Sequence, residues 1–304
     1  RAMAAAGRPW PHPMPFPVTV VAAVTNLDSL GHAYVTRYRY HDGYYDGVAK
    51  QFRGFGRVEQ IEMGDATAPT LVTRSHFDTG RVHEAMKGRL LRTTAEQEDA
   101  GMFWDETTTW TSPPRVLLTG TNGTNVTFVH PTVQVTRIQE LGQGAEKRTE
   151  SEFNYDDYGN LTRQADYGIV DDGDRSAWDD ERITVTDYAL NLDAWIVHLP
   201  MRAVISDEQG AVLSRVESYY DDETFSGQNL GWVTVGDLTL QREWPYPKDS
   251  AASIASLRQA FDRFGNHILS LDPLAVAPEG TVDFTQGHAR QIDYDDAFHA
   301  YPVV

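Results

Sequence analysis

The stretch that decides the fold is Tyr34–Glu62, which reads YVTRYRYHDGYYDGVAKQFRGFGRVEQIE. In its first part, tyrosine and threonine alternate with valine and arginine, and this period of two sends one set of side chains to each face of a β-sheet. Asp42-Gly43 and Asp46-Gly47 supply the positive-φ residues that tight turns need. The two glycines around Phe55 predict a bulge or a close approach of a neighbouring backbone. The stretch therefore predicts a strand, a turn and a returning strand.

We expect the residues of this hairpin to have a structural role, because none of them forms a pattern typical of catalysis. The residues to which we assign that role are Tyr38, Tyr40, His41, Gly43, Tyr44, Gly47, Phe52, Gly54, Phe55 and Gly56.

The sequence around the hairpin predicts further strands and one short helix. The β-branched run Val18–Thr25 predicts a strand before the hairpin, and Thr70–Phe77 predicts one after it. Val82–Lys87 is typical of a short helix that Gly88 ends, whereas residues 93–101 have no clear period and predict a surface loop. Prolines at alternate positions favour an extended lead-in within residues 1–17. Other strand-like runs before residue 150 are Arg89–Arg92, Thr107–Thr111, Val116–Leu118, Thr127–His130 and Val133–Thr136, with Pro131 at an edge strand or a bend.

Composition excludes several classes of partner and site. The 304 residues carry a net charge of −18, which repels phosphate backbones and anionic lipid, so we expect neither nucleic acid nor a membrane surface as a partner. The sequence has no cysteine, which excludes disulfides and thiolate metal sites. Arg1 is not an initiator methionine, and Arg1–Gly7 lacks the apolar core of a signal peptide, so we expect a processed or excised piece of a longer protein.

The second half of the chain carries a loose hairpin repeat. One full copy lies in residues 153–162 and another in residues 260–269; each has an aromatic residue before an Asp that can bond the turn, and Gly-Asn within the turn. Partial copies occur at Tyr219–Asp222 and Tyr294–Asp296, and Ile205–Val212 predicts a further hairpin. The residues expected to form the two full turns are Tyr155, Asp156, Gly159, Asn160, Phe261, Asp262, Gly265 and Asn266.

One segment of this half fits two structures. Ile254, Leu257 and Phe261 have helical spacing, with Asp249 or Ser250 as a candidate N-cap. The repeat places the same residues in a strand that leads into the second full turn. We predict the strand, because the pattern from Phe261 onward matches the first copy.

Several strings resemble the middle region of the B component of bacterial Tc insecticidal toxin complexes, and the Tyr-Asp turns resemble the wider RHS/YD-repeat proteins. The strings are PFPV (15–18), YVTRY (34–38), YHDGYYDG (40–47), FRGFG (52–56), KGRLLR (87–92), FVHP (128–131) and YDDAFHAYPV (294–303). Asp42 and Tyr45 stand where the family has His and Phe, which marks a divergent member.

The resemblance implies an all-β fold of irregular stacked antiparallel hairpins, forming a curved strip of an RHS/YD-type hollow shell. It divides the chain into a lead-in at 1–17, a toxin-B-middle-like region at 18–150 and RHS/YD-like hairpins at 151–304. It implies a secreted bacterial protein whose shell encloses a cytotoxic polypeptide for delivery. The implied partners are the remaining shell segments of the same or a companion chain, the enclosed toxin polypeptide and a pore-forming component. The self-cleaving aspartates of the family are missing, so Asp156 and Asp262 receive no protease role.

No motif in the sequence predicts an enzyme, a cofactor or a metal site. There is no His-Glu-x-x-His, no Gly-x-Ser-x-Gly and no phosphate loop. The acidic run at 171–181 lacks the glycine and final glutamate of an EF-hand, so a solvated loop is favoured over a calcium site. Two alternatives to the shell stay open: a cell-surface RHS/YD adhesin-like protein, and a carbohydrate-binding or carbohydrate-active β protein, whose carboxylates pair in space rather than in sequence.

Overall fold

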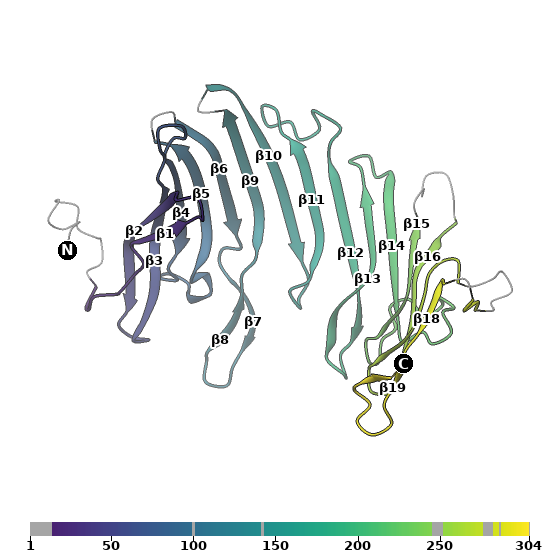
Figure 1. Ribbon diagram of the computed structural model, residues 1–304. Helices are drawn as coiled ribbons and strands as arrows, with labels where there is room; N and C mark the ends of the chain where they lie inside the picture. Colours follow the sequence, from purple (N-terminus) through teal and green to yellow (C-terminus); the bar gives the residue numbers. More distant parts are fainter. Residues whose placement is uncertain are drawn as a thin grey trace. The chain divides into compact units, whose positions relative to one another are not determined.

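The computed structural model describes residues 14–98, 101–140, 143–244, 252–275, 282–285 and 287–303 (Figure 1). Within these ranges the chain is almost entirely β, as predicted, and its one helical element is a single 3-10 turn, η1 (Glu84–Met86). None of the described helical segments is long and apolar enough to cross a membrane. Residues 1–13 of the predicted lead-in lie outside the described residues.

The chain divides into two compact units. Unit 1 comprises Arg1–Phe153 and Asp166–Trp178, and unit 2 comprises Asn154–Ala165 and Asp179–Val304. The hairpin strands β10 (Gln143–Tyr155) and β11 (Leu161–Ile169) contribute residues to both units. The division of the chain at residues 17 and 150, implied by the family resemblance, stays a prediction.

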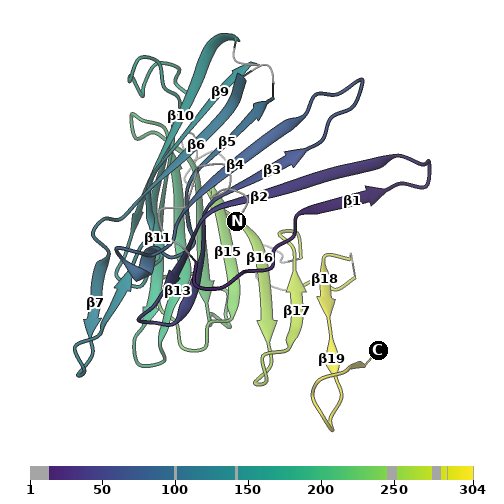
Figure 2. The ribbon, with the colours of Figure 1, turned by 90° about the vertical axis from the view of Figure 1, so that its left-hand side faces the viewer.

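Unit 1 is built on an antiparallel sheet in which neighbours in sequence are neighbours in space, as Figure 2 shows for β1 to β3. After β6, the chain makes a separate two-stranded ribbon, β7 (Arg115–Thr119) with β8 (Asn125–Phe128), before it returns to the sheet. The sheet strands in order are β1 (Ala23–Leu27), β2 (Ala33–Asp46), β3 (Gln51–Glu62), β4 (Leu71–Asp78), β5 (Arg89–Gln97), β6 (Gly101–Trp110), β9 (Pro131–Glu140) and β10.

Unit 2 continues the same pattern of consecutive antiparallel strands. A short ribbon of β19 (Asp293–Tyr294) and β20 (Pro302–Val303) follows its sheet. Its buried hydrophobic cluster is small, with Ala189, Tyr220 and Val233 at the centre. The sheet strands in order are β12 (Arg182–Asn191), β13 (Ile196–Ser206), β14 (Val212–Tyr220), β15 (Leu238–Trp244), β16 (Ile254–Phe261), β17 (His267–Leu271) and β18 (Ala289–Gln291).

The structure corrects three predictions in unit 1. The strand expected at Val18–Thr25 begins only at Ala23. The helix expected at Val82–Lys87 shortens to η1, because the Gly88 amide returns to the Asp78 carbonyl at 2.7 Å and closes the loop. Residues 93–97, expected in a loop, form the second half of β5. Thr93 and Thr94 interrupt the hydrophobic period because their partners across the sheet are polar or charged, as in the pair of Thr94 with Asp105.

The structure also decides two other predictions, one for Pro131 and one for the segment from Ile254 to Phe261, which fits either a helix or a strand. Pro131 is the first residue of β9, a position where its missing N–H breaks no ladder; β9 itself lies between β6 and β10, so the predicted edge strand is wrong. The strand predicted over the helix-like spacing is confirmed as β16.

Candidate functional site

The central hairpin is present, and its turn follows Asp46, at the second of the two Asp-Gly pairs where the sequence predicts a turn. β2 and β3 pair from Thr36 opposite Glu62 to Asp46 opposite Gln51, which leaves residues 47–50 as the turn. The Asp46 carboxylate accepts hydrogen bonds from the amides of Val48 and Ala49 at 2.8 and 3.0 Å. In this turn Lys50, and not Gly47, has positive φ.

The bulge predicted around Phe55 lies in β3. Gly43 pairs with Phe55 and Tyr45 pairs with Phe52, so that Arg53 and Gly54 together oppose one residue of β2. Gly54 has a φ of +96°, a conformation that costs a residue with a Cβ roughly 1–2 kcal/mol. At Gly56, a Cβ would lie 3.3 Å from the Cβ of Asp42 on the partner strand. The two glycines therefore serve different purposes, the first in the bulge and the second in a close approach of strands.

Aromatic rings pack on one another along this hairpin. The ring centroids of Tyr40 and Phe55 are 4.9 Å apart, and those of Phe52 and Phe55 are 5.2 Å apart. Phe16 meets Tyr45 edge to face at 5.0 Å and so ties the end of the lead-in to the hairpin. These rings are half-buried or exposed rather than fully enclosed, so the cluster packs the two strands of the hairpin together at the surface of the sheet.

Arg53 ties the bulge to the loop before η1, and no pattern in the sequence singled it out. Its guanidinium is buried, lies 2.7 Å from an oxygen of Asp46 and donates a 2.7 Å hydrogen bond to the Gly80 carbonyl. Its Nη2 also lies 3.3 Å from Glu84. Arg53 therefore fixes the bulge to this loop through a buried ion pair and a hydrogen bond.

The opposite face of the unit 1 sheet is charged, and we call it the arginine face. Its members are Arg39, Glu59, Arg74, Thr94, Asp105 and Arg137, which pair across β2, β3, β4, β5, β6 and β9 in that order. Paired residues of neighbouring strands lie on one face of a sheet, so the row runs directly across the strands.

Each buried carboxylate of this face has arginines around it. Glu59 is 8% exposed, and nitrogens of Arg39, Arg57, Arg74 and His41 lie 3.5 to 3.8 Å from its oxygens. Asp105 is 4% exposed; Arg92 donates to its two oxygens at 2.7 and 3.2 Å, and Arg137 lies 3.6 Å away. At the end of the row, Glu150 pairs with Arg148 and Arg175.

The same arrangement recurs in unit 2 around Glu217, which is 4% exposed. Arg215 donates to it through Nε at 3.1 Å, and the Tyr219 hydroxyl donates at 2.6 Å. Burial and then this hydrogen bond raise the pKa of Tyr219 to about 12. In unit 1, burial and then the positive charges of Arg57, Arg92 and Arg74 lower the pKa of His76, which keeps that imidazole neutral.

The first full Tyr-Asp turn is closed by a set of bonds around Asp156. The Asp156 carboxylate accepts hydrogen bonds from the amides of Tyr158 and Asn160, both at 2.9 Å, and from Asn160 Nδ2 at 2.8 Å. The same Nδ2 also donates at 2.6 Å to the carbonyl of Val197, in the next hairpin. The Asn side chain therefore closes its own turn and links two hairpins.

The second full turn repeats this network atom for atom. Asp262 accepts from the amides of Phe264 and Asn266 at 2.8 and 2.9 Å and from Asn266 Nδ2 at 2.9 Å, and that Nδ2 donates at 2.7 Å to the His299 carbonyl. Burial raises the pKa of Asp262, but the hydrogen bonds from Asn266 and Phe264 outweigh burial and lower it.

Two other turns have the same backbone but a different fifth residue. In the Asp207 turn the fifth residue is Ala211, whose amide bonds the carboxylate at 2.6 Å and whose methyl side chain has no nitrogen to donate to another hairpin. In the Asp28 turn, His32 Nδ1 takes the place of the Asn nitrogen at 2.7 Å from the carboxylate. The aspartate thus makes the turn, and the asparagine adds the link.

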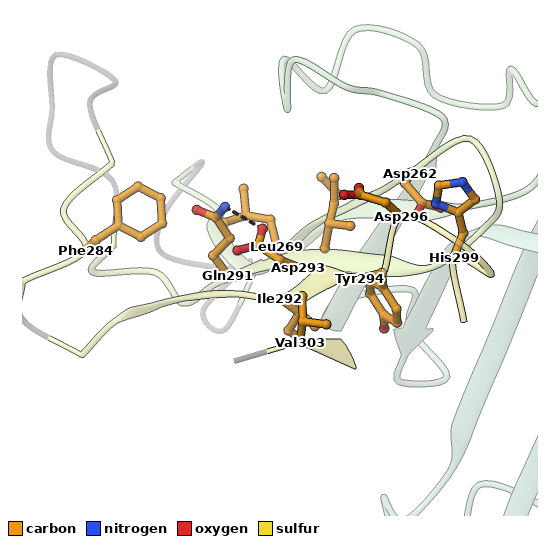
Figure 3. A pocket seen from close by; sticks show the side chains of 12 residues that line it. Asp262, Leu269, Phe284, Gln291, Ile292, Asp293, Tyr294, Asp296, His299 and Val303 are labelled. Carbon is orange, nitrogen blue, oxygen red and sulfur yellow. Dashed lines mark hydrogen bonds between the residues drawn. The ribbon is translucent and has the colours of Figure 1, made fainter. Parts of the chain in front are cut away.

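A cavity of about 630 Å³ lies beside the second turn in unit 2. Figure 3 shows Asp262 and His299 together at one side of it, with Phe284 at the other. Gln291 donates to Asp293 at 3.1 Å between them. Since the oxygens of Asp262 are used by its turn, this carboxylate is a structural acceptor in the wall of the cavity.

Across the ranges that the structure describes, no three His, Cys, Asp or Glu side chains gather as they would around a metal ion. Part of the acidic run closes as a turn, in which Asp171 and Asp174 exchange backbone hydrogen bonds of 3.1 and 2.7 Å.

Comparison with known proteins identifies the first part of the chain. Residues 1–85 match the family model of the insecticide toxin TcdB middle/N-terminal region. A search of curated protein sequences finds no significant match.

Solved structures match over most of the chain. A crystal structure of TcdB2-TccC3-TEV has a TM-score of 0.70 at 13% identity, covering 99% of this chain and 22% of its own. The structure of TcdB2-TccC3-Cdc42 has a TM-score of 0.62 at 17% identity, covering 89% of this chain and 19% of its own. A Tc holotoxin pore of Photorhabdus luminescens with a TccC3 variant has a TM-score of 0.54 at 14% identity, covering 79% of this chain and 17% of its own.

The chain thus spans about a fifth of the length of the solved chains that it matches. At these identities the structures establish the fold, while the family model supplies the sequence relationship. The resemblance seen in the sequence is confirmed: residues 1–85 match the TcdB middle/N-terminal region, and the chain has the antiparallel β fold of part of the TcdB2-TccC3 shell.

Proposed function

We propose that this chain is a wall segment of a Tc-type toxin shell that encloses a cytotoxic polypeptide until delivery, and that it has no catalytic activity of its own. The observation that carries the proposal is the structural match to TcdB2-TccC3 over 99% of the chain. The TcdB-type sequence at residues 1–85 supports the same assignment.

The bonding within each unit suits a wall. Every described strand of the two sheets pairs with its sequence neighbours or, where the β7–β8 ribbon intervenes, with the next sheet strand. Ion pairs buried on the sheet face and asparagine links between turns supply contacts that a globular domain obtains from a second packed layer. A wall built in this way keeps one polar face for an aqueous lumen or for solvent.

The partners of such a segment follow from its place in a toxin complex. They are the remaining shell segments, the enclosed polypeptide and a pore-forming component, and the assembled toxin is secreted. The net charge of −18 opposes direct binding to nucleic acid or to anionic membrane surfaces.

The test is protection of the enclosed polypeptide from protease. The complete protein that carries this chain is produced with its companion toxin polypeptide, and digestion is followed with and without prior denaturation of the shell. We expect the companion to be cut only after denaturation. Equal digestion in both states, or saturable sugar binding or hydrolysis by the chain, would favour the carbohydrate or adhesin alternatives and overturn the proposal.

A further inference from the structure

One end of the unit 2 hairpins carries large apolar side chains exposed to solvent, and we call it the aromatic rim. Its turns comprise residues 156–160, 191–196, 221–237, 262–266 and 295–301. The exposed side chains are Tyr158, Leu192, Trp195, Trp232, Val235, Phe264, Phe298 and Tyr301, and three of them, Trp195, Phe298 and Tyr301, are 70%, 76% and 67% exposed.

Hydrogen bonds hold neighbouring turns of the rim together at three places. Every second connection of an antiparallel sheet lies at the same end, as Figure 1 shows for the β12–β13 turn and the hairpin at β19. Asn160 and Asn266 bond carbonyls of the following turns, and Asn191 Nδ2 donates to the Val233 carbonyl at 2.8 Å. Rings also meet across turns: Tyr158 lies 6.2 Å from Trp195, and Phe264 stacks on His299 at 4.3 Å.

The charge of the rim is strongly negative. Its five turns contain ten Asp or Glu residues against one arginine and no lysine. The arginine, Arg263, lies over the Phe264 ring at 4.6 Å. Asp157, Asp193, Glu223 and Asp296 are exposed among the aromatic side chains. A surface that fits this rim has apolar side chains to cover the rings and basic side chains to meet the carboxylates.

We propose that the aromatic rim docks onto a further segment of the same shell protein, one that presents lysine or arginine among apolar side chains. This inference rests on the proposed function. Exposed apolar patches of this kind mark protein interfaces, where Trp and Tyr carry much of the binding energy. The segment belongs to the same polypeptide because the solved chains of this fold are about five times as long as the part matched here.

Other ligand classes fit the rim less well. The ten carboxylates of the rim would repel a phosphate backbone or an anionic lipid. For a sugar, the aspartates that could bond hydroxyl groups are already used by the turns: Asp221 accepts from the amides of Thr234 through Asp237, and Asp262 accepts from its own turn. Tyr158 and Trp195 meet at 85° and so form no flat platform.

The experiment places a photo-crosslinking amino acid in the intact protein at Trp195 or Phe298, with Val48 as the matched control. Val48 is 96% exposed and lies in a turn of unit 1. We expect crosslinks from the two rim positions to peptides of the same polypeptide outside residues 1–304, and those peptides should contain lysine or arginine. Crosslinks only to a separate polypeptide, or a yield no higher than at Val48, would overturn the inference.

A second set of variants tests the chemistry of the contact. With the crosslinker at Phe298, Trp195→Ser with Trp232→Ser should lower the yield about tenfold, the effect of losing one interface hot spot. Asp193→Asn with Glu223→Gln should also lower it, and should reduce its dependence on salt. An unchanged yield in both sets refutes the docking surface, even where the companion polypeptide stays protected from protease. Loss of protection in the unsubstituted protein instead refutes the proposed function.

Discussion

The link that Asn160 makes between two hairpins can be removed without removing the turn that contains it. Asn160→Ala abolishes the 2.6 Å bond to the Val197 carbonyl and the 2.8 Å bond to the Asp156 carboxylate. A neutral hydrogen bond contributes about 0.5–1.5 kcal/mol net and a charged one about 1.5–3 kcal/mol. Since the site is only half-buried, we expect a loss near the lower end of their sum, about 2 kcal/mol.

Hydrogen exchange in the intact protein measures this loss locally. A loss of about 2 kcal/mol should raise the opening equilibrium of residues 154–162 and 194–200 about 30-fold. Gln209→Ala is the control, because Gln209 is an exposed residue of the Asp207 turn, whose fifth residue, Ala211, has no side-chain nitrogen to donate. Asn160→His separates the two bonds: His32 shows that a histidine can bond the turn carboxylate, so the 154–162 turn should stay protected while 194–200 opens. Equal exchange in Asn160→Ala and Gln209→Ala would falsify the link.

Four further predictions concern the central hairpin, a buried tyrosine and the chain alone. Phe55→Ala should lower the free energy of unfolding by about 2–3 kcal/mol, below the range for a fully buried ring, because Phe55 is half-buried against Tyr40 and Phe52. Thermal unfolding measures this loss, and a loss below about 1 kcal/mol contradicts the packing role of the aromatic cluster. Gly54→Val should be more harmful than Gly47→Val, because only Gly54 needs positive φ; equal effects would remove the bulge argument. The pKa of Tyr219 is raised to about 12 in the folded state, from about 10 in the unfolded state. The stability that the neutral Tyr219 phenol contributes is therefore complete below the unfolded-state pKa and is lost as pH rises through the folded-state pKa. An ultraviolet difference titration of wild type against Tyr219→Phe should show a phenol ionising near the folded-state pKa, and ionisation near the unfolded-state pKa refutes the prediction. The isolated chain should sediment as oligomers or aggregate, since β1 is the edge strand of the sheet that the structure describes; a compact, cooperatively unfolding monomer contradicts this.

The hairpins could be predicted from the sequence because their signals are local. Period-two alternation and Asp-x-x-Gly turns act within about ten residues, and the turns at Asp156, Asp207 and Asp262 all form where expected. In the central hairpin only the second of the two predicted Asp-Gly pairs, Asp46-Gly47, adjoins the turn, although Asp42, with positive φ, satisfies the local turn pattern equally well. It lies instead inside β2, opposite Gly56, where the absence of a Cβ on the partner strand admits it.

The charged contacts could not be predicted, because they depend on strand register. Arg39, Glu59 and Arg74 are neighbours on the sheet, yet they are about twenty and fifteen residues apart in the chain, and a slip of one residue would move each of them to the other face. The link from Asn160 to Val197 likewise needs the position of the following hairpin. The aspartate of each turn was identified from sequence, whereas the second role of the asparagine required the structure.

The arginine face explains how a sheet of this kind stays ordered with a small apolar core. A sheet with one hydrophobic face would have to bury that face against a second layer, whereas Glu59, Asp105 and Glu150 each have two or more arginine side chains around them. The long arginine stems cover the sheet while their guanidinium groups satisfy the carboxylates. Removing one partner leaves a buried charge, at a cost of about 3–5 kcal/mol, so each pair also fixes the register of the strands that it joins. A strip held in this way needs no layer across its face, and that property is what the wall of a hollow container requires.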